Sequence, residues 1–132
     1  MFRIALVLAC LASALPVQSG QPLKYPEGST HCAGYLARPA KMAASAPGVL
    51  IIHQWMGLTD HERRTADNLA KLGYVALAAD IYGEGVRPQN VQEAVAQITV
   101  YKGDRNLYQR RIRAGLDALK AHGMLLRASR LR

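Results

Sequence analysis

The sequence predicts an α/β fold in which a mostly parallel sheet carries helices on both faces. Two apolar segments of strand length, residues 48–53 and 74–80, lie on either side of a helical pattern at residues 59–72. Each segment is apolar on successive residues, as expected of strands buried on both faces of a parallel sheet. A strand, a helix and a strand with short connections form a βαβ unit, which pairs its strands in parallel. The 132 residues, 50% of them hydrophobic, suffice for one domain with a packed core.

The N-terminal residues 1–19 are predicted to be a signal peptide. A basic residue, Arg3, is followed by an apolar run at residues 4–15 and then by small residues. This order is typical of secretory signals, with cleavage after Ala14 or Ser19. The run is shorter than the ~20 residues that a membrane-spanning helix needs. We therefore expect a secreted or periplasmic protein that does not associate with the membrane once the signal is removed.

The remaining domain, residues 20–123, is predicted to begin with a strand pair. Its strands lie at residues 23–25 and 31–36, and a turn at Pro26-Glu27-Gly28 joins them. The one cysteine left after signal cleavage, Cys32, lies in the second strand and cannot form an internal disulfide. A buried structural thiol is its expected role.

The helix between the two apolar strands has recognisable ends. Thr59 and Glu62 have the spacing of a capping box, in which each side chain accepts a hydrogen bond from the other residue's backbone. Gly73 is placed where a glycine commonly ends a helix. A helix from Thr59 to Gly73 is the prediction.

Two further helices are predicted after the second apolar strand. Asn90 opens the first of them, which extends to about Tyr101, and residues 102–105 interrupt the pattern. Asn106 is expected to cap the last helix, which ends at residues 122–123. Its apolar face comprises Tyr108, Ile112, Leu116 and Leu119.

The net charge of +8 is concentrated toward the C-terminal end of the sequence. Nine of the 17 Lys and Arg residues follow residue 101. No aromatic-interleaved groove or known motif accompanies them, so we expect a solvated helix face and no nucleic-acid partner. The four histidines lack metal-ligand spacing backed by a third ligand, so no metal is expected. No cofactor is expected either, because the loop after the first apolar strand lacks the glycines of a dinucleotide-binding turn.

The loops after the two apolar strands are the predicted substrate cleft, because ligands of open α/β sheets bind outside the carboxyl ends of the strands. The first loop suits an oxyanion hole, in which backbone N–H groups stabilise a developing negative charge. His53 ends a buried strand and is expected to anchor this loop rather than to transfer protons. The side chains assigned to the cleft loops are those of His53, Met56, Gly57, Tyr82 and Arg87.

Two segments carry a resemblance to a known family. Residues 48–57 read GVLIIHQWMG and residues 72–83 read LGYVALAADIYG. In this order and spacing they resemble the dienelactone hydrolase family, and the similarity extends over about residues 24–122. Shorter matches lie at residues 26–39, 102–105 and 113–119.

The resemblance implies an α/β-hydrolase fold and the hydrolysis of small carboxylic esters or lactones. Members use a Cys or Ser nucleophile in a G-x-C-x-G type of turn, with Asp and His farther along the chain, and react through an acyl-enzyme. By resemblance, the backbone N–H of Trp55 is one oxyanion donor and Gln54 contacts the nucleophile. The best-studied members have Glu at the position of Gln54, and Gln cannot act as a base. They have Arg at the position of Glu84, a charge that Arg87 replaces in part.

No G-x-[CS]-x-G pattern occurs in the 132 residues. The catalytic nucleophile, acid and base are therefore expected beyond residue 132. The chain is predicted to be the N-terminal portion of a hydrolase, truncated or frameshifted before the nucleophile strand and inactive alone. Residues 124–132 form an aberrant basic tail in this interpretation. The alternative is a non-catalytic small binding protein or fragment derived from a hydrolase.

Overall fold

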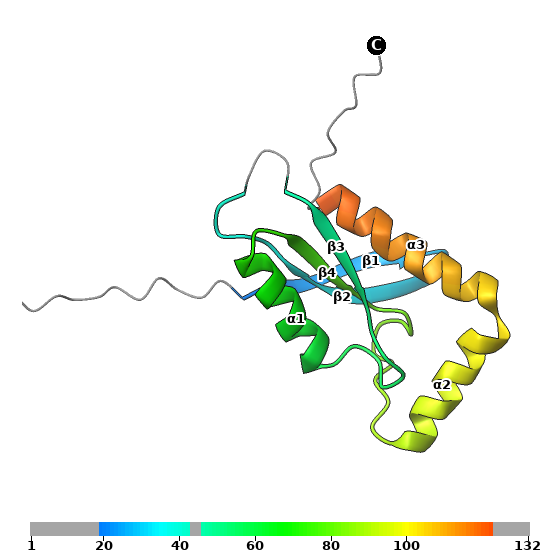
Figure 1. The fold of residues 1–132 in the computed structure, drawn as a ribbon. Coiled ribbons are helices and arrows are strands. Elements are labelled where there is room, and N and C mark those ends of the chain that lie inside the picture. Colours follow the sequence, from blue (N-terminus) through cyan, green and yellow to red (C-terminus); the bar gives the residue numbers. More distant parts are fainter. Residues whose placement is uncertain (1–18, 43–45, 123–132) are drawn as a thin grey trace, which may run out of the picture.

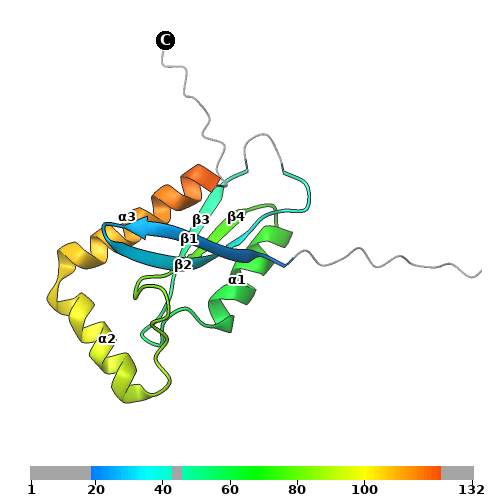
Figure 2. The same ribbon diagram turned by 180° about the vertical axis from the view of Figure 1, so that it is seen from behind.

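The computed structural model describes residues 19–42 and 46–122. The basic tail and all but the last residue of the expected signal peptide lie outside these ranges. Figures 1 and 2 show the described part from opposite sides.

One sheet of four strands organises the molecule, in the order β1-β2-β4-β3. The strands are β1 (Gln21–Glu27), β2 (Thr30–Ala37), β3 (Gly48–Ile52) and β4 (Val75–Ala79). β3 and β4 pair in parallel, as the βαβ prediction requires. β1 pairs with β2, and β2 with β4, both antiparallel. The expected α/β fold is confirmed; within the described residues the sheet is mixed, because the leading hairpin adds its second strand antiparallel to β4.

The βαβ helix, α1 (Asp60–Lys71), has the predicted ends. The backbone N–H of Thr59 donates to the carboxylate of Glu62 at 2.8 Å, and the Thr59 hydroxyl accepts in turn, which completes the capping box. Gly73 follows the helix with a φ of +97°. Its N–H donates to the Ala70 carbonyl at 3.0 Å, as expected of a glycine that ends a helix.

Helices cover both faces of the sheet, α1 one face and α3 (Arg105–His122) the other (Figures 1 and 2). Small side chains form the buried contact under α1, namely Ala37, Ala66, Ala70 and Ala76. On the opposite face α3 approaches β4 closely, since a Cβ at Gly115 would lie 3.0 Å from that of Ala79. The core under α3 includes Tyr25, Cys32, Leu36, Val75, Leu77, Ala118 and Leu119.

The junction between α2 (Val91–Gly103) and α3 differs from the prediction. Asn90 caps α2 as expected. Asp104, not Asn106, caps α3, because its carboxylate accepts the N–H of Leu107 at 2.9 Å. α2 continues to Gly103, which leaves one residue between the helices, and Asp is as good a cap as Asn. α2 lies beyond the end of the sheet and packs mainly on α3 (Figure 1).

The two apolar strands differ in burial. Every residue of β4 is buried, because β4 lies between β2 and β3. Every residue of β3 is half-buried, because β3 lies at the edge of the sheet. The apolar side chains of β3 are therefore less completely buried than those of β4 in the described part of the chain.

Across residues 19–42 and 46–122, none of the helices combines the length and apolar character needed to cross a bilayer.

Candidate functional site

The loops that follow β3 and β4 lie at the same edge of the sheet, because these two strands are parallel. The first loop folds as a tight turn in which the N–H of Gly57 donates to the Gln54 carbonyl at 3.0 Å. Gly57 has a φ of +82°, a conformation that favours glycine. A Cβ here would also lie 3.4 Å from the side chains of Tyr82 and Pro88, so the second loop packs directly against this turn.

His53 joins the two loops through both ring nitrogens. Its Nε2 accepts the N–H of Ile81 at 3.2 Å, and its Nδ1 donates to the Gln54 carbonyl at 2.7 Å. These partners assign a neutral ring with its proton on Nδ1. Burial lowers the pKa of His53, against the opposing effect of the bond to Gln54. The side chain thus anchors the loop, as the sequence predicted.

The peptide unit between Gln54 and Trp55 is held in a fixed orientation. Its carbonyl oxygen accepts two hydrogen bonds, from Gly57 and from His53. In a trans peptide the N–H points opposite to the carbonyl, and the described chain has no cis peptide. The Trp55 N–H is therefore oriented by its own peptide plane. Within the described residues it donates no hydrogen bond.

The next peptide is fixed as well, since the Trp55 carbonyl accepts the hydroxyl of Tyr82 at 2.8 Å. The Tyr82 ring packs against His53 with centroids 4.6 Å apart. Trp55 is 41% exposed as a residue, while its backbone carbonyl is bonded within the site, so the backbone is the part of Trp55 that is fixed in the loop.

A hollow of about 290 Å³ opens beside this turn. Gln54 is exposed at its rim. The residues that line it are Gln54, Met56, Gly57, Thr59, His61 and Glu62. The structure thus brings together the predicted residues 53–57 and Tyr82. Of the residues assigned to the cleft, Arg87 is placed differently.

The guanidinium of Arg87 turns toward a buried carboxylate. Its Nη1 lies 3.2 Å from Asp80, which is fully buried and also accepts the N–H of Ala33 at 2.9 Å. The same guanidinium donates to the carbonyls of Gly83, Val86 and Ala33. These bonds fix the loop after β4 onto β2. They commit Nη1 and part of Nη2 to groups of the protein itself.

Sequence patterns did not identify a second buried ionic group. Arg111 in α3 is 6% exposed, with its Nη1 3.3 Å from the sulfur of Cys32 and its Nε 3.3 Å from the carboxylate of Glu27. Burial raises the pKa of the Cys32 thiol, although Arg111 opposes this. Cys32 has no solvent exposure, so it is a structural thiol. Only the pairing of residues far apart in sequence reveals this group.

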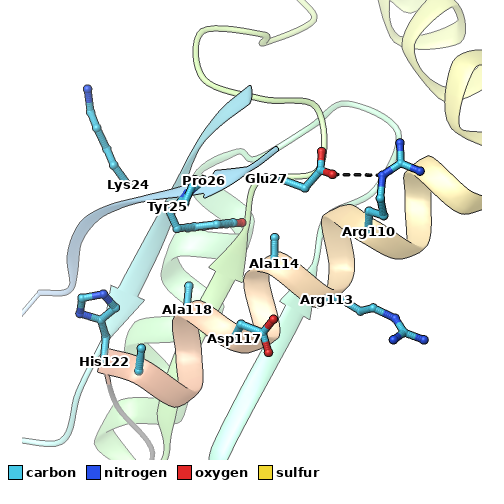
Figure 3. Close-up of a pocket in the computed structure, with 11 residues that line it drawn as sticks. Lys24, Tyr25, Pro26, Glu27, Arg110, Arg113, Ala114, Asp117, Ala118 and His122 are labelled. Carbon is cyan, nitrogen blue, oxygen red and sulfur yellow. Dashed lines mark hydrogen bonds and ion pairs between the residues drawn. The ribbon is translucent and has the colours of Figure 1, made fainter. Parts of the chain in front are cut away.

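A larger hollow, of about 460 Å³, lies elsewhere, between β1 and α3 (Figure 3). Lys24 and Glu27 line it from β1, and Arg110 and Asp117 from α3. Arg110 and Glu27 pair across it at 3.1 Å. No residue of the two loops after β3 and β4 contributes to it, so it is separate from the candidate oxyanion loop. Among the described residues, no group of three or more His, Cys, Asp or Glu side chains is arranged to hold a metal ion.

Comparisons with known proteins agree on one family. The dienelactone hydrolase family model matches residues 32–125. Protein usf of Aquifex pyrophilus is 30% identical over 105 residues, which are 76% of this chain and 44% of that protein. The hydrolase fragment YghX of Escherichia coli (strain K12) is 42% identical over 55 residues, which are 42% of this chain and 47% of that protein.

Two solved structures have a similar fold. The protein m3DLH gives a TM-score of 0.74 at 34% identity and covers 77% of this chain and 42% of its own. The dienelactone hydrolase-like promiscuous phosphotriesterase P91, from metagenomic libraries, gives 0.73 at 35% identity and covers 79% of this chain and 43% of its own. The chain spans less than half the length of each of these relatives.

The family match begins in β2 and extends past α3, so it includes both loops described above. The α/β-hydrolase fold predicted from the sequence is confirmed by the solved relatives. This chain therefore belongs to the dienelactone hydrolase family.

Proposed function

We propose that this chain supplies the oxyanion side of a hydrolase that cleaves small carboxylic esters or lactones through an acyl-enzyme. Trp55 provides one backbone donor of the oxyanion hole, and Gln54 contacts the nucleophile. The nucleophile, acid and base lie outside the 132 residues, so the chain alone does not turn over substrate. The fixed Gln54–Trp55 peptide is the observation that carries the proposal.

The chemistry that this peptide supports is the stabilisation of a tetrahedral intermediate. When a Cys or Ser attacks the ester carbonyl, the carbonyl oxygen takes up negative charge. An N–H that is already oriented stabilises this charge without reorganisation, and such a donor contributes about 3–4 kcal/mol to the transition state. Gln54 has no ionisable group, so it orients the nucleophile by hydrogen bonding and leaves proton transfer to other residues.

The test supplies the missing part of the fold. Residues 20–122 are joined to the portion of P91 that follows its matching helix, and hydrolysis of an activated ester is measured. The Trp55→Pro change removes the backbone N–H. Proline suits this position, because residue 55 is the second residue of the turn closed by Gly57 and Gln54 and has a negative φ. The Trp55→Ala change is the matched control, since it keeps the N–H.

We expect Trp55→Pro to lower kcat by about 10²- to 10³-fold while Trp55→Ala keeps most of it. A Trp55→Pro variant that is as active as the unsubstituted joined protein would remove Trp55 from the oxyanion hole. If Trp55→Ala loses as much activity as Trp55→Pro, the side chain and not the N–H carries the effect, and the assignment is wrong.

We also propose that the protein is exported and acts outside the cytoplasm or in the periplasm. The support is the order of basic, apolar and small residues in positions 1–19. Mass spectrometry of the protein recovered from its native host tests this. We expect a mature N-terminus after Ala14 or Ser19, and an intact leader on cytoplasmic protein would contradict export.

A further inference from the structure

The candidate oxyanion loop is tied to the loop after β4 at two adjacent residues, Ile81 and Tyr82. The N–H of Ile81 donates to the ring of His53, and the same ring holds the Gln54 carbonyl. The hydroxyl of Tyr82 donates to the Trp55 carbonyl at 2.8 Å. A turn that is held at one peptide can pivot about it, whereas bonds to two successive peptides restrain this motion.

The side chain of Tyr82 is itself fixed by packing. Tyr82 is 5% exposed, and its ring packs against those of His53 and Tyr101, with centroids 4.6 and 5.3 Å away. The turn contacts the same ring, because a Cβ at Gly57 would lie 3.4 Å from it. The hydroxyl therefore has little freedom to move away from the carbonyl that it holds.

The Tyr82 hydroxyl has a single proton, and the loop takes it. Burial raises the pKa of Tyr82 above its ordinary value of 10.0, so the hydroxyl remains a donor at neutral pH. Because that proton is donated to the Trp55 carbonyl, it is not free for a substrate. Any effect of this hydroxyl on hydrolysis therefore has to act through the loop.

The backbone of Trp55 connects the two restrained peptides. Its N–H belongs to the peptide whose carbonyl is that of Gln54, and its own carbonyl belongs to the next peptide. A donor to an oxyanion is effective only in the correct position, and a misplacement of about 1 Å can lower the rate about 10²-fold. Restraints on both peptides keep this N–H in one position before the substrate reacts.

We propose that Tyr82 is a positioning residue of the hydrolase, whose hydroxyl keeps the Trp55 N–H aligned with the developing oxyanion. This role rests on the proposed function, since it requires the Trp55 N–H to be an oxyanion donor. The restraint on the loop does not depend on that function and can be measured separately. A tyrosine that only stabilises the fold would change neither the motion of the loop nor kcat.

The first measurement is of hydrolysis by the joined protein that carries Tyr82→Phe, which keeps the ring and removes the hydroxyl. We expect kcat to fall about tenfold with little change in KM, because one hydrogen bond that acts on the transition state is lost. Tyr108→Phe is the matched control and should keep both values. Tyr108 belongs to the same row of aromatic rings, but it is Tyr82 whose hydroxyl donates to the loop.

The second measurement is of backbone motion in the ¹⁵N-labelled 132-residue chain by NMR relaxation. A dispersed spectrum establishes first that each variant is folded. We expect order parameters of about 0.85, the value of a rigid backbone, at the amides of Trp55 and Met56. Tyr82→Phe should lower both toward about 0.6, and Tyr108→Phe should leave them unchanged.

Unchanged order parameters in Tyr82→Phe would show that its hydroxyl does not restrain the loop. If Tyr82→Phe keeps full kcat while Trp55→Pro loses it, the positioning role is wrong and the oxyanion assignment stands. If Trp55→Pro is fully active as well, the oxyanion assignment falls and the positioning role falls with it. An equal loss of kcat in Tyr108→Phe would assign the effect to aromatic packing instead.

Discussion

At the scale of single residues, one carbonyl oxygen organises the candidate site. The Gln54 carbonyl accepts from Gly57 and from His53, and the peptide plane transmits this constraint to the N–H of Trp55. His53 can donate from Nδ1 and accept at Nε2 only while it is neutral. Its protonation therefore breaks the bond to Ile81, which links the loop to the end of β4.

This dependence predicts that the free energy of unfolding falls as the pH drops below 6.5, the ordinary pKa of histidine. Burial holds the folded pKa lower, so in this window the unfolded chain binds more protons than the folded chain. Stability is fully present above the unfolded pKa and is lost toward the folded pKa, at up to about 1.4 kcal/mol per pH unit.

Urea unfolding at about pH 7.5 and about pH 5.5 measures the effect. The His53→Gln variant, whose amide can both donate and accept, should show a flatter dependence. The other histidines are present in both proteins, so a variant with the same pH dependence as the native chain would assign the effect elsewhere.

How far the sequence could predict individual residues depended on the range of their contacts. The places of His53 at a strand end and of Gly57 in a turn could be predicted, because both depend on residues that are adjacent in the sequence. The burial of Arg111 does not, because Cys32 and Glu27, which contact it, come from the distant hairpin. The choice of Asp104 over Asn106 as cap was missed because both residue types cap helices equally well.

At the scale of elements, α1 positions the loop that precedes it. The capping box at Thr59 fixes the first turn of the helix directly after the candidate oxyanion loop. Both ends of α1 could be predicted, because caps and terminal glycines have local sequence signals. The hairpin was predicted for the same reason, although β1 and β2 are longer than the predicted strands.

We predict that Thr59→Ala lowers the free energy of unfolding by about 1 kcal/mol, because the N-terminal amide of the helix loses its acceptor. Thr65→Ala is the control, since the Thr65 hydroxyl bonds to the His61 carbonyl inside the helix and alanine has the higher helix propensity. Urea unfolding compares the two. An equal loss in both variants would show that the cap contributes nothing specific.

At the scale of the whole molecule, the strand order leaves β3 at an edge. Its five residues are apolar and half-buried, and none carries a charge that would discourage pairing with another strand. This order could not be predicted in full, because the pairing of β2 with β4 joins segments on either side of the βαβ unit.

We predict that the isolated chain self-associates through β3 as its concentration rises. Val49→Lys should reduce this association, since Val49 belongs to none of the three buried clusters and a charge there disfavours strand pairing. Val91→Lys is the control, at an exposed position on α2. Sedimentation velocity of the native chain and the two variants measures the self-association. An equal reduction in both variants would indicate non-specific surface association rather than pairing at the edge strand.

The exposed edge at β3 also provides a test of the alternative, a small binding protein. Such a protein has to remain folded and monomeric without further strands. A cooperative thermal transition of a monomeric chain, with no effect of Val49→Lys, would favour that alternative over the hydrolase fragment.

The central claim is that these residues hold the oxyanion loop of a hydrolase but not its nucleophile. Hydrolysis of an activated ester by the purified 132-residue chain tests it most directly. We predict a rate equal to that of buffer, since no G-x-[CS]-x-G turn is present and Cys32 is fully buried. Turnover well above buffer that Trp55→Pro abolishes would contradict the account and place a nucleophile within this chain.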